Sequence, residues 1–395
     1  MDKKLIYVDH AATTYIKPEV FEAMKPYLTE LYGNPSSIYY LGRESKKAID
    51  EARSQIAYCV GAHPQEIYFT GSGTEADNWA IKGTAYANRK KGKHIITSAI
   101  EHHAILEPVE FLHKEGFDVT YLPVDQNGLI NPADLDKAIR PDTTLVSIMY
   151  ANNEIGTIQP IKELAEIANK KGVIFHTDAV QAMGNIPVNV NDLGVDLLSM
   201  SAHKFYGPKG VGCLYVRKGV KLEGFMHGGA QERKKRAGTE NVSGIVGMAA
   251  ALKLAYENMD RYNEHLTKLS SRLIDKVFER VPHVRLNGDR YKRLPGNVNF
   301  SFEFIEGESL LLMLDMKGIQ ASSGSACTSG SLDPSHVLLA IGLPHEIAHG
   351  SLRITFGERN TEEDVDYIVD CIEEIVEKLR QMSPLYEDFI KKNKS

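Results

Sequence analysis

The feature that most constrains the fold of this 395-residue chain is an alternation of short apolar runs with helical patterns between about residues 44 and 216. Strands that alternate with helices form βαβ units, so the pattern predicts a mainly parallel sheet. We expect strands at 67–70, 94–97, 119–123, 145–150, 173–177, 197–200 and 212–216. One intervening helix is marked by apolar residues at helical spacing, with Gly61 as its expected end; these are Ala48, Ile49, Ala52, Ile56 and Ala57.

The pattern changes after residue 216. A long helical stretch at about 246–280 leads into two further expected strands, at 298–302 and 352–356, and a final helix near 361–380. A chain of this length favours two domains. We therefore expect an α/β protein with a large domain that carries the mainly parallel sheet, at 12–257, and a smaller α+β domain, at 1–11 and 258–395.

The composition excludes several classes of function. The chain has 46 Lys and Arg against 52 Asp and Glu, and this acidic balance argues against direct binding to nucleic acid. No apolar run reaches the roughly 18 residues that cross a bilayer, so we expect no membrane contact. The four cysteines, Cys59, Cys213, Cys327 and Cys371, form no C-x-x-C pair. Their spacing argues against a zinc ribbon or a disulfide framework and predicts a reducing, cytoplasmic location.

Polar residues gather where five of the predicted strands end. Each cluster alone has an ordinary interpretation, such as a turn with a helix cap, a structural histidine or a surface lysine. Ligands of open α/β sheets bind beyond the carboxyl ends of the strands, however, and five clusters at one edge predict a binding site. The clusters are Gly71-Ser72-Gly73-Thr74-Glu75, Glu101-His102-His103, Asn152-Asn153-Glu154, His176-Thr177-Asp178 with Gln181, and Ser201-Ala202-His203-Lys204.

Together these clusters match the requirements of pyridoxal phosphate (PLP). Gly73 and Thr74, at the start of a helix, suit a phosphate. Asp178 suits the pyridine nitrogen, where a carboxylate keeps the ring protonated, and Lys204 supplies the amine that binds the cofactor covalently. The other expected cofactor contacts are His102 over the ring face, Ser201 and His203 at the phosphate, and Gln181 and Asn153 at the ring oxygen and the substrate.

Three longer motifs carry a family resemblance. Residues 201–210, Ser-Ala-His-Lys-Phe-Tyr-Gly-Pro-Lys-Gly, resemble the cofactor-lysine motif of class V aminotransferase-fold enzymes. With residues 7–14, Tyr-Val-Asp-His-Ala-Ala-Thr-Thr, and 151–156, Ala-Asn-Asn-Glu-Ile-Gly, the chain resembles cysteine desulfurases of the NifS/IscS type over about residues 5–380. The resemblance implies conversion of L-cysteine to L-alanine. It also implies a sulfur-acceptor protein, such as an iron–sulfur scaffold, that serves iron–sulfur cluster assembly or the thiolation of cofactors and tRNA.

Cys327 decides the reaction within this family. It lies in a stretch of small and polar residues, 322–331, whose composition predicts a mobile loop at about 320–335 in the smaller domain. The other three cysteines stand among apolar residues, as packing cysteines do. The stretch resembles the catalytic loop of the longer-loop group, which implies that the Cys327 thiolate attacks the substrate sulfur and becomes a persulfide.

The resemblance also implies roles for residues outside that loop. Arg353 and Asn153 are expected to hold the substrate carboxylate, because two parallel N–H bonds of a guanidinium fix its charge and orientation. Lys204 is expected to remove the Cα proton, with His102 as a further proton carrier. Residues 236–241 match a family segment whose threonine, here Thr239, reaches the phosphate in the neighbouring subunit, which implies a homodimer.

Three alternatives compete with this interpretation. Residues 345–349, His-Glu-Ile-Ala-His, form a literal H-E-x-x-H zinc motif, but flanking glycine and proline residues leave little more than one helical turn, so we expect no metal. A non-catalytic scaffold is disfavoured because Lys204 and Cys327 are both present. Another PLP reaction, such as transamination, is disfavoured by Cys327, while selenocysteine stays open as a side substrate.

Overall fold

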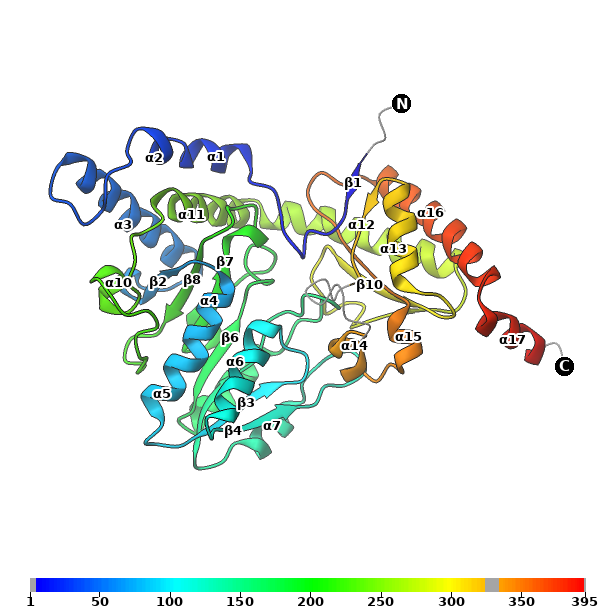
Figure 1. Cartoon of the computed structure of the whole chain (residues 1–395), viewed down its shortest axis with the longest axis horizontal. Helices are drawn as coiled ribbons and strands as arrows, with labels where there is room; N and C mark the ends of the chain where they lie inside the picture. The colour runs from blue at the N-terminus through cyan, green and yellow to red at the C-terminus, as the bar shows by residue number, and fades with distance from the viewer. Residues whose placement is uncertain (1–4, 324–333, 394–395) are drawn as a thin grey trace.

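A seven-stranded sheet forms the larger part of the molecule (Figure 1). The computed structural model describes residues 5–323 and 334–393. The strand order is β2-β8-β7-β6-β5-β3-β4, and only β8 runs against its neighbours. The prediction of a mainly parallel sheet is therefore confirmed. The strands are β2 (Ile67–Thr70), β3 (His94–Ser98), β4 (Asp118–Leu122), β5 (Thr143–Ser147), β6 (Ile174–Asp178), β7 (Leu197–Ser201) and β8 (Gly212–Val216).

Helices cover both faces of this sheet. Neighbouring residues of one strand enter different apolar clusters: Leu145 of β5 belongs to the cluster that contains Ile105 of the helix His103–Lys114, whereas Val146 belongs to the cluster that contains Ile49 of the helix Tyr40–Val60. Strands buried on both faces are continuously apolar, which explains the short apolar runs of the sequence. The helices of this part are α1 (Pro18–Met24), α2 (Pro26–Thr29), α3 (Tyr40–Val60), α4 (Gly73–Asn78), α5 (Thr84–Asn88), α6 (His103–Lys114), α7 (Pro132–Ala138), α8 (Ile161–Lys170), α9 (Val190–Leu193), α10 (Gln231–Lys234) and α11 (Val242–Glu257), with a π turn at Trp79–Gly83.

The helix α3 forms where the apolar spacing predicts it. Its buried face includes Ala48, Ile49, Ala52 and Ile56. Gly61 follows in the left-handed conformation, with φ of 71°, and its N–H bonds back to the carbonyl of Tyr58. A left-handed residue after a helix is the usual place for glycine, so the expected helix end is confirmed.

A second, smaller sheet has an apolar core of its own. Its order is β12-β10-β9, and all its pairs are antiparallel. Figure 1 shows α12, α13 and α16 packed around it, apart from the large sheet. The N-terminal strand β1 pairs in parallel with β11 beside this core. The elements are β1 (Ile6–Tyr7), β9 (Val284–Leu286), β10 (Asn297–Phe302), β11 (Ile319–Gln320), β12 (Ser351–Thr355), α12 (Met259–Arg280), α13 (Gly307–Met316), α14 (His336–Ala340), α15 (His345–His349), α16 (Glu362–Gln381) and α17 (Pro384–Asn393).

The expectation of one long helix at about 246–280 is wrong. The chain forms α11 and α12, which meet at Asn258 with φ of −116° and ψ of 7°. The Nδ2 atom of Asn258 donates to the carbonyl of Leu254 at 2.8 Å, so the side chain occupies a carbonyl at the end of α11. Asparagine competes with the backbone for hydrogen bonds in this way, and that competition ends helices.

The parallel strands bring their carboxyl ends to one edge of the large sheet. β3, β5, β6 and β7 run in the same direction in adjacent positions. The residues that follow these strands therefore lie close together, in the place where such sheets bind ligands. Among the described residues, no helix is long and apolar enough to cross a membrane.

Candidate active site

A cavity of about 310 Å³ lies at this edge of the large sheet. Its size falls at the lower end of the range for small-molecule sites. The structure places ten of the twelve predicted site residues around this one cavity. They are Gly73, Thr74, His102, Asn153, Asp178, Gln181, Ser201, His203, Lys204 and Arg353.

Lys204 lies at the end of the short 3-10 turn Ala202–Lys204, which follows β7. Its Nζ atom donates to the carbonyls of Ala11 and Ala12, at 2.6 Å and 2.8 Å. The Nε2 atom of Gln181 donates to the same Ala11 carbonyl at 2.9 Å. The segment after β1 thus forms one wall of the cavity and holds the lysine amine there.

Asp178 ends β6 and forms part of the cavity wall together with Lys204. Burial raises the pKa of its carboxyl to about 6, while the N–H of Val180, which donates to Oδ1 at 2.8 Å, and the positive charge of Lys204 oppose the rise. The carboxylate thus has partners that favour its charged form. A buried carboxylate in this position suits a protonated ring nitrogen.

His102 caps the N-terminus of α6. Its Nδ1 atom accepts from the backbone N–H of Ala104 at 3.0 Å. Burial, followed by the charge of Lys204, lowers the pKa of His102 to about 4. The ring is therefore neutral at pH 7 and carries its proton on Nε2, because Nδ1 is an acceptor.

The start of α4 gives the cavity a small, polar end. The Ser72 side chain caps the helix by accepting from the N–H of Glu75 at 3.0 Å. A methyl group on Gly73 would lie 2.8 Å from Cγ2 of Val180 and 3.1 Å from Cβ of Ser201, so only glycine fits here.

Burial also lowers the pKa of His203, to about 4, and its Nδ1 atom lies 3.1 Å from Oγ1 of Thr13.

Arg353 reaches the cavity from the smaller sheet. It is buried on β12, and its Nη2 atom lies 2.7 Å from Oδ1 of Asp9. Its Nη1 atom donates to the carbonyl of Asn153 at 3.0 Å. Arg353 therefore joins three segments at the cavity: the stretch after β1, the turn after β5, and β12.

Cys327 lies outside the described residues. The described residues that flank it on both sides are bonded beside the cavity. The backbone of Ser322 pairs with that of Arg353, and the Ser335 Oγ atom donates to Oε2 of Glu154 at 2.5 Å. Burial raises the pKa values of the other three thiols, Cys59, Cys213 and Cys371, which makes them weak nucleophiles at neutral pH.

Thr239 is exposed and does not line the cavity of its own chain. The segment that bears it is tied to the cavity through Arg236, whose Nε atom lies 2.7 Å from Oε1 of Glu75. Glu75 also accepts from the N–H of Gly71 at 2.8 Å. Thr239 is therefore the predicted cofactor residue that the structure places on the surface, away from the cavity of its own chain.

Sequence reasoning missed several residues of the cavity. The carbonyls of Ala11 and Ala12 have no side-chain signature, although both residues stand in the quoted motif at 7–14. Asp9 stands in the same motif, but nothing in the sequence pairs it with Arg353. Asp77 lies just after the quoted cluster 71–75, in a polar run that is also typical of an ordinary helix start.

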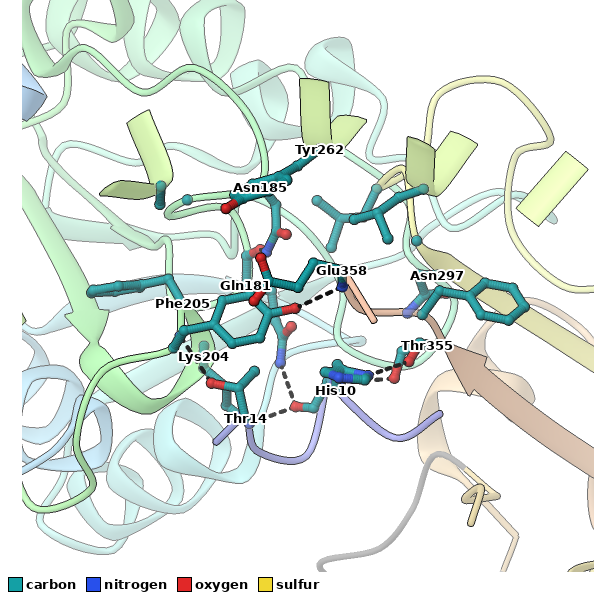
Figure 2. A pocket seen from close by; sticks show the side chains of 18 of the residues that line it. His10, Thr14, Gln181, Asn185, Lys204, Phe205, Tyr262, Asn297, Thr355 and Glu358 are labelled. Carbon is teal, nitrogen blue, oxygen red and sulfur yellow. Dashed lines mark hydrogen bonds between the residues drawn. The ribbon is translucent and has the colours of Figure 1, made fainter. Parts of the chain in front are cut away.

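A second, narrower cavity adjoins the first. Figure 2 shows it between His10, Tyr262 and Glu358, and it shares Lys204 and Gln181 with the larger cavity. Its volume of about 60 Å³ admits only a few water molecules, so the larger cavity is the candidate site.

The H-E-x-x-H segment forms α15, which spans only five residues, with the two histidine ring centroids 6.2 Å apart. Across the described ranges, no group of three or more His, Cys, Asp or Glu side chains is arranged to hold a metal ion.

The donor set of the large cavity fits PLP. Hydroxyl, imidazole and backbone groups at Thr74, Ser201 and His203 suit a phosphate, and the glycine-only contact at Gly73 leaves room for it. Asp178 and Lys204 suit the ring nitrogen and the aldehyde carbon of the cofactor.

Comparison with known proteins agrees with this fit. The model of the aminotransferase class V family matches residues 6–368. The cysteine desulfurase IscS of Clostridium botulinum is 59% identical over 390 residues, which cover 98% of each chain. A solved NifS-like protein superposes with a TM-score of 0.90 at 41% identity, covering 95% of this chain and all of that one. The structure of SspA in complex with cysteine superposes with a TM-score of 0.80 at 37% identity, covering 89% of this chain and 98% of that one.

Proposed function

Because this chain belongs to the aminotransferase class V family and is a PLP-dependent cysteine desulfurase within it, we propose that the strand-end cavity is where it takes sulfur from L-cysteine. The observation that carries the proposal is the meeting of Lys204, Asp178 and Arg353 at one cavity, although they come from three different strands or turns. A lysine amine, a ring-nitrogen carboxylate and a substrate-carboxylate arginine are three of the groups that the reaction needs. When bound, PLP supplies an electron sink that stabilises negative charge at the substrate Cα.

The chain's own residues bind and orient the substrate. Arg353 and Asn153 lie within hydrogen-bonding reach of each other at the rim that faces the smaller sheet, which suits a carboxylate there. Lys204 Nζ is the base that we assign to the Cα proton of cysteine. Neutral His102 carries its proton on Nε2, and we assign it as the group that donates a proton to the substrate.

Cys327 is the group that we assign to sulfur transfer. Its thiolate attacks the sulfur of bound cysteine, the carbon–sulfur bond breaks, and Cys327 becomes a persulfide while L-alanine leaves. The assignment is supported by the flanking residues: Ser322 pairs with the cavity residue Arg353, and Ser335 bonds Glu154, the neighbour of the cavity residue Asn153. It is also supported by the raised pKa values of the other three thiols.

The test is to supply L-cysteine and measure alanine and sulfide in the presence of a reductant. Equal amounts of both are expected from the wild-type chain. Cys327→Ser should keep the absorbance of bound PLP but lose sulfide release by roughly a thousandfold or more. Cys59→Ser, a matched change on α3, should turn over normally. Normal turnover by Cys327→Ser, or alanine without sulfide in the wild type, would contradict the proposal.

We further propose that the enzyme is a homodimer in which Thr239 reaches the phosphate of the partner subunit. Ile38 and Tyr58 are 89% and 83% exposed, and they line one groove on α3 and the turn before it. A neighbouring groove, whose lining is mostly polar and charged, is bounded jointly by α3 and by residues of the segment 230–240. The exposed Ile38 and Tyr58 side chains therefore lie near the segment that bears Thr239, and large exposed apolar side chains support an interface there.

We also propose an acceptor for the persulfide sulfur. An iron–sulfur scaffold protein is the acceptor that the similarity to IscS proteins favours, and thiolation of cofactors or tRNA is the alternative. A persulfide on Cys327 requires a reduced thiol at the start of each cycle, so we propose a reducing location such as the cytoplasm. Transfer of labelled sulfur from the chain to a purified scaffold protein distinguishes the acceptors.

A further inference from the structure

Asp77 is a buried acid at the cavity that the proposed reaction does not use. It lies on α4 and is only 1% exposed. It lines the same cavity as Asp178, so two carboxyl groups share one site. The Oδ1 atom of Asp77 is fully buried and has no hydrogen-bond partner among the described residues.

The nearest ring to Asp77 cannot neutralise a charge on it. His176 of β6 lies with its Nε2 atom 3.7 Å from Oδ1 of Asp77. The ring is held between serines of the two neighbouring strands: its Nδ1 atom lies 2.8 Å from Oγ of Ser147 on β5, and its Nε2 atom lies 2.9 Å from Oγ of Ser199 on β7. Burial lowers the pKa of His176 to about 3, so the ring is neutral. Asp77 therefore faces an uncharged imidazole.

The charged groups that raise the pKa of Asp77 are acids. Burial is the largest cause that raises the pKa of Asp77, and the charges of Asp178 and Glu101 raise it further, whereas a hydrogen bond with Ser199 lowers it. Glu101, on the turn after β3, is itself buried with a pKa raised to about 8 by burial. The positive charge of Lys204 lowers the pKa of Asp178.

Two carboxyl groups in one buried site do not both ionise when only one of them has a cation and an N–H donor. Asp178 has the Val180 N–H at 2.8 Å and the charge of Lys204. Asp77 has a neutral ring and one oxygen without a hydrogen bond, which a neutral acid tolerates far better than a carboxylate.

We propose that Asp77 is a positioning residue that stays protonated at neutral pH and so leaves Asp178 as the single charged carboxylate available to the ring nitrogen of the cofactor. The proposal rests on the assignment of Asp178 to the ring nitrogen made above. A second negative charge at Asp77 would repel the charge on Asp178 and favour protonation of Asp178 itself. A protonated Asp77 removes that repulsion while its side chain still lines the cavity.

The sign of the pH effect separates this role from an ordinary structural one. The unfolded chain releases the Asp77 proton at a pKa of about 3.9, whereas the folded chain holds it to higher pH. The stability that Asp77 contributes is therefore complete below about pH 4 and is lost as pH rises toward its folded pKa. Removing the acid should stabilise the protein at neutral pH, which the loss of a structural carboxylate would never do.

The experiment compares melting of the PLP-saturated holoenzyme and of Asp77→Asn at pH 5.5, 7.0 and 8.5. We expect the variant to melt about 2–5 °C higher at pH 7.0, with a difference that widens as pH rises. Asp77→Ser, smaller and equally neutral, repeats the test if the amide does not fit. Asp388→Asn on the exposed helix α17 is the matched control and should show no widening difference.

The absorbance of bound PLP provides a second readout. Asp77→Asn should keep the bound cofactor at pH 7.0, whereas Asp178→Asn should bind it roughly tenfold or more weakly. Variants of Asp77 that melt lower than the wild type at every pH, or with a difference independent of pH, would overturn the role of Asp77. Wild-type PLP affinity in Asp178→Asn would instead overturn the cofactor assignment on which the role depends.

Discussion

The guanidinium of Arg353 lies 2.7 Å from the carboxylate of Asp9, and this pair connects the smaller sheet to the segment that holds Lys204. Both side chains are largely buried, so the pair is well shielded from solvent. The pair orients the arginine that we assign to the carboxylate of cysteine, and the first prediction follows from that orientation.

Replacing Asp9 with Asn removes the charge that orients Arg353 while keeping the shape of the side chain. We expect the KM for cysteine to rise about tenfold, with a smaller change in kcat, because substrate binding depends on the direction of the guanidinium. Steady-state kinetics with cysteine measures both constants. Arg353→Lys should raise KM further, since an ammonium lacks the paired N–H groups. An unchanged KM in Asp9→Asn would show that Asp9 does not orient Arg353 for substrate binding.

A methyl group added at Gly73 should weaken cofactor binding. The Cβ atom would lie 2.8 Å from Val180 and 3.1 Å from Ser201, closer than carbon atoms pack. Overpacking of this kind costs about 1–3 kcal/mol, so PLP affinity should fall about tenfold or more in Gly73→Ala. Gly71→Ala is the control, because its methyl approaches closely only the end of the Glu75 side chain and meets Arg236 at an ordinary contact distance of 3.5 Å. Equal PLP affinity in the two variants, measured by fluorescence titration of the apoenzyme, would contradict the proposed phosphate end.

Acid should unfold the protein through its buried histidines. Burial lowers the pKa of His176 to about 3 and those of His102 and His203 to about 4. Because the unfolded chain takes up their protons near pH 6.5, the stability they contribute is present above that pH and is lost as pH falls toward 4. For His176 alone the loss is about 2 kcal/mol at pH 5.

Urea unfolding at pH 7 and pH 5 measures this effect. His176→Gln should lose less stability than the wild type between the two values, because glutamine does not titrate. A variant with the same pH dependence as the wild type would show that His176 is not the residue responsible.

A buried ion pair should support the turn that precedes Thr239. Three consecutive residues, Glu232, Arg233 and Lys234, are left-handed, with φ of 40°, 57° and 64°, a conformation that side chains disfavour. Glu232 accepts from Nη2 of Arg53 at 2.6 Å and from the N–H of Phe69 at 3.0 Å. Glu232→Gln leaves a buried guanidinium with its charge uncompensated, which costs about 3 kcal/mol.

Thermal melting and size-exclusion chromatography of Glu232→Gln test this support. We expect a lower Tm together with a larger monomer fraction, since the turn carries the segment that we assign to the partner subunit. Glu257→Gln, which removes an exposed pair with Lys253, should change neither by a measurable amount. A lower Tm with an intact dimer would show that the turn stabilises the fold but does not contribute to the dimer interface.

The strand ends were predictable from sequence because chemistry and chain order coincide there. Asp178 and Ser201 end consecutive strands, so the alternation of strands and helices already places them at one edge. Asp9 and Ala11 were not predictable in the same way. They meet Arg353 and Lys204 across more than 190 residues of chain, and backbone carbonyls leave no trace in side-chain patterns.

Asp77 and the break at Asn258 show two further limits. Asp77 stands in a polar run that is typical of an exposed helix start, and the packing of α4 against β7, β8 and α6 buries it. Asn258 interrupts an otherwise continuous helical pattern without glycine or proline, and its side-chain bond to Leu254 is visible only in three dimensions.

The pairing of β1 with β11 determines how late during synthesis this part of the fold can form. Ile6 leaves the ribosome long before its partner Ile319, which follows more than 300 residues later. At roughly 5–20 residues per second, the segment with Ile6 waits about 15–60 s before that partner exists. The wall that contains Ala11 and Ala12 therefore closes around Lys204 only after Ile319 has been made, and a chain released before that point would carry the lysine without its complete pocket.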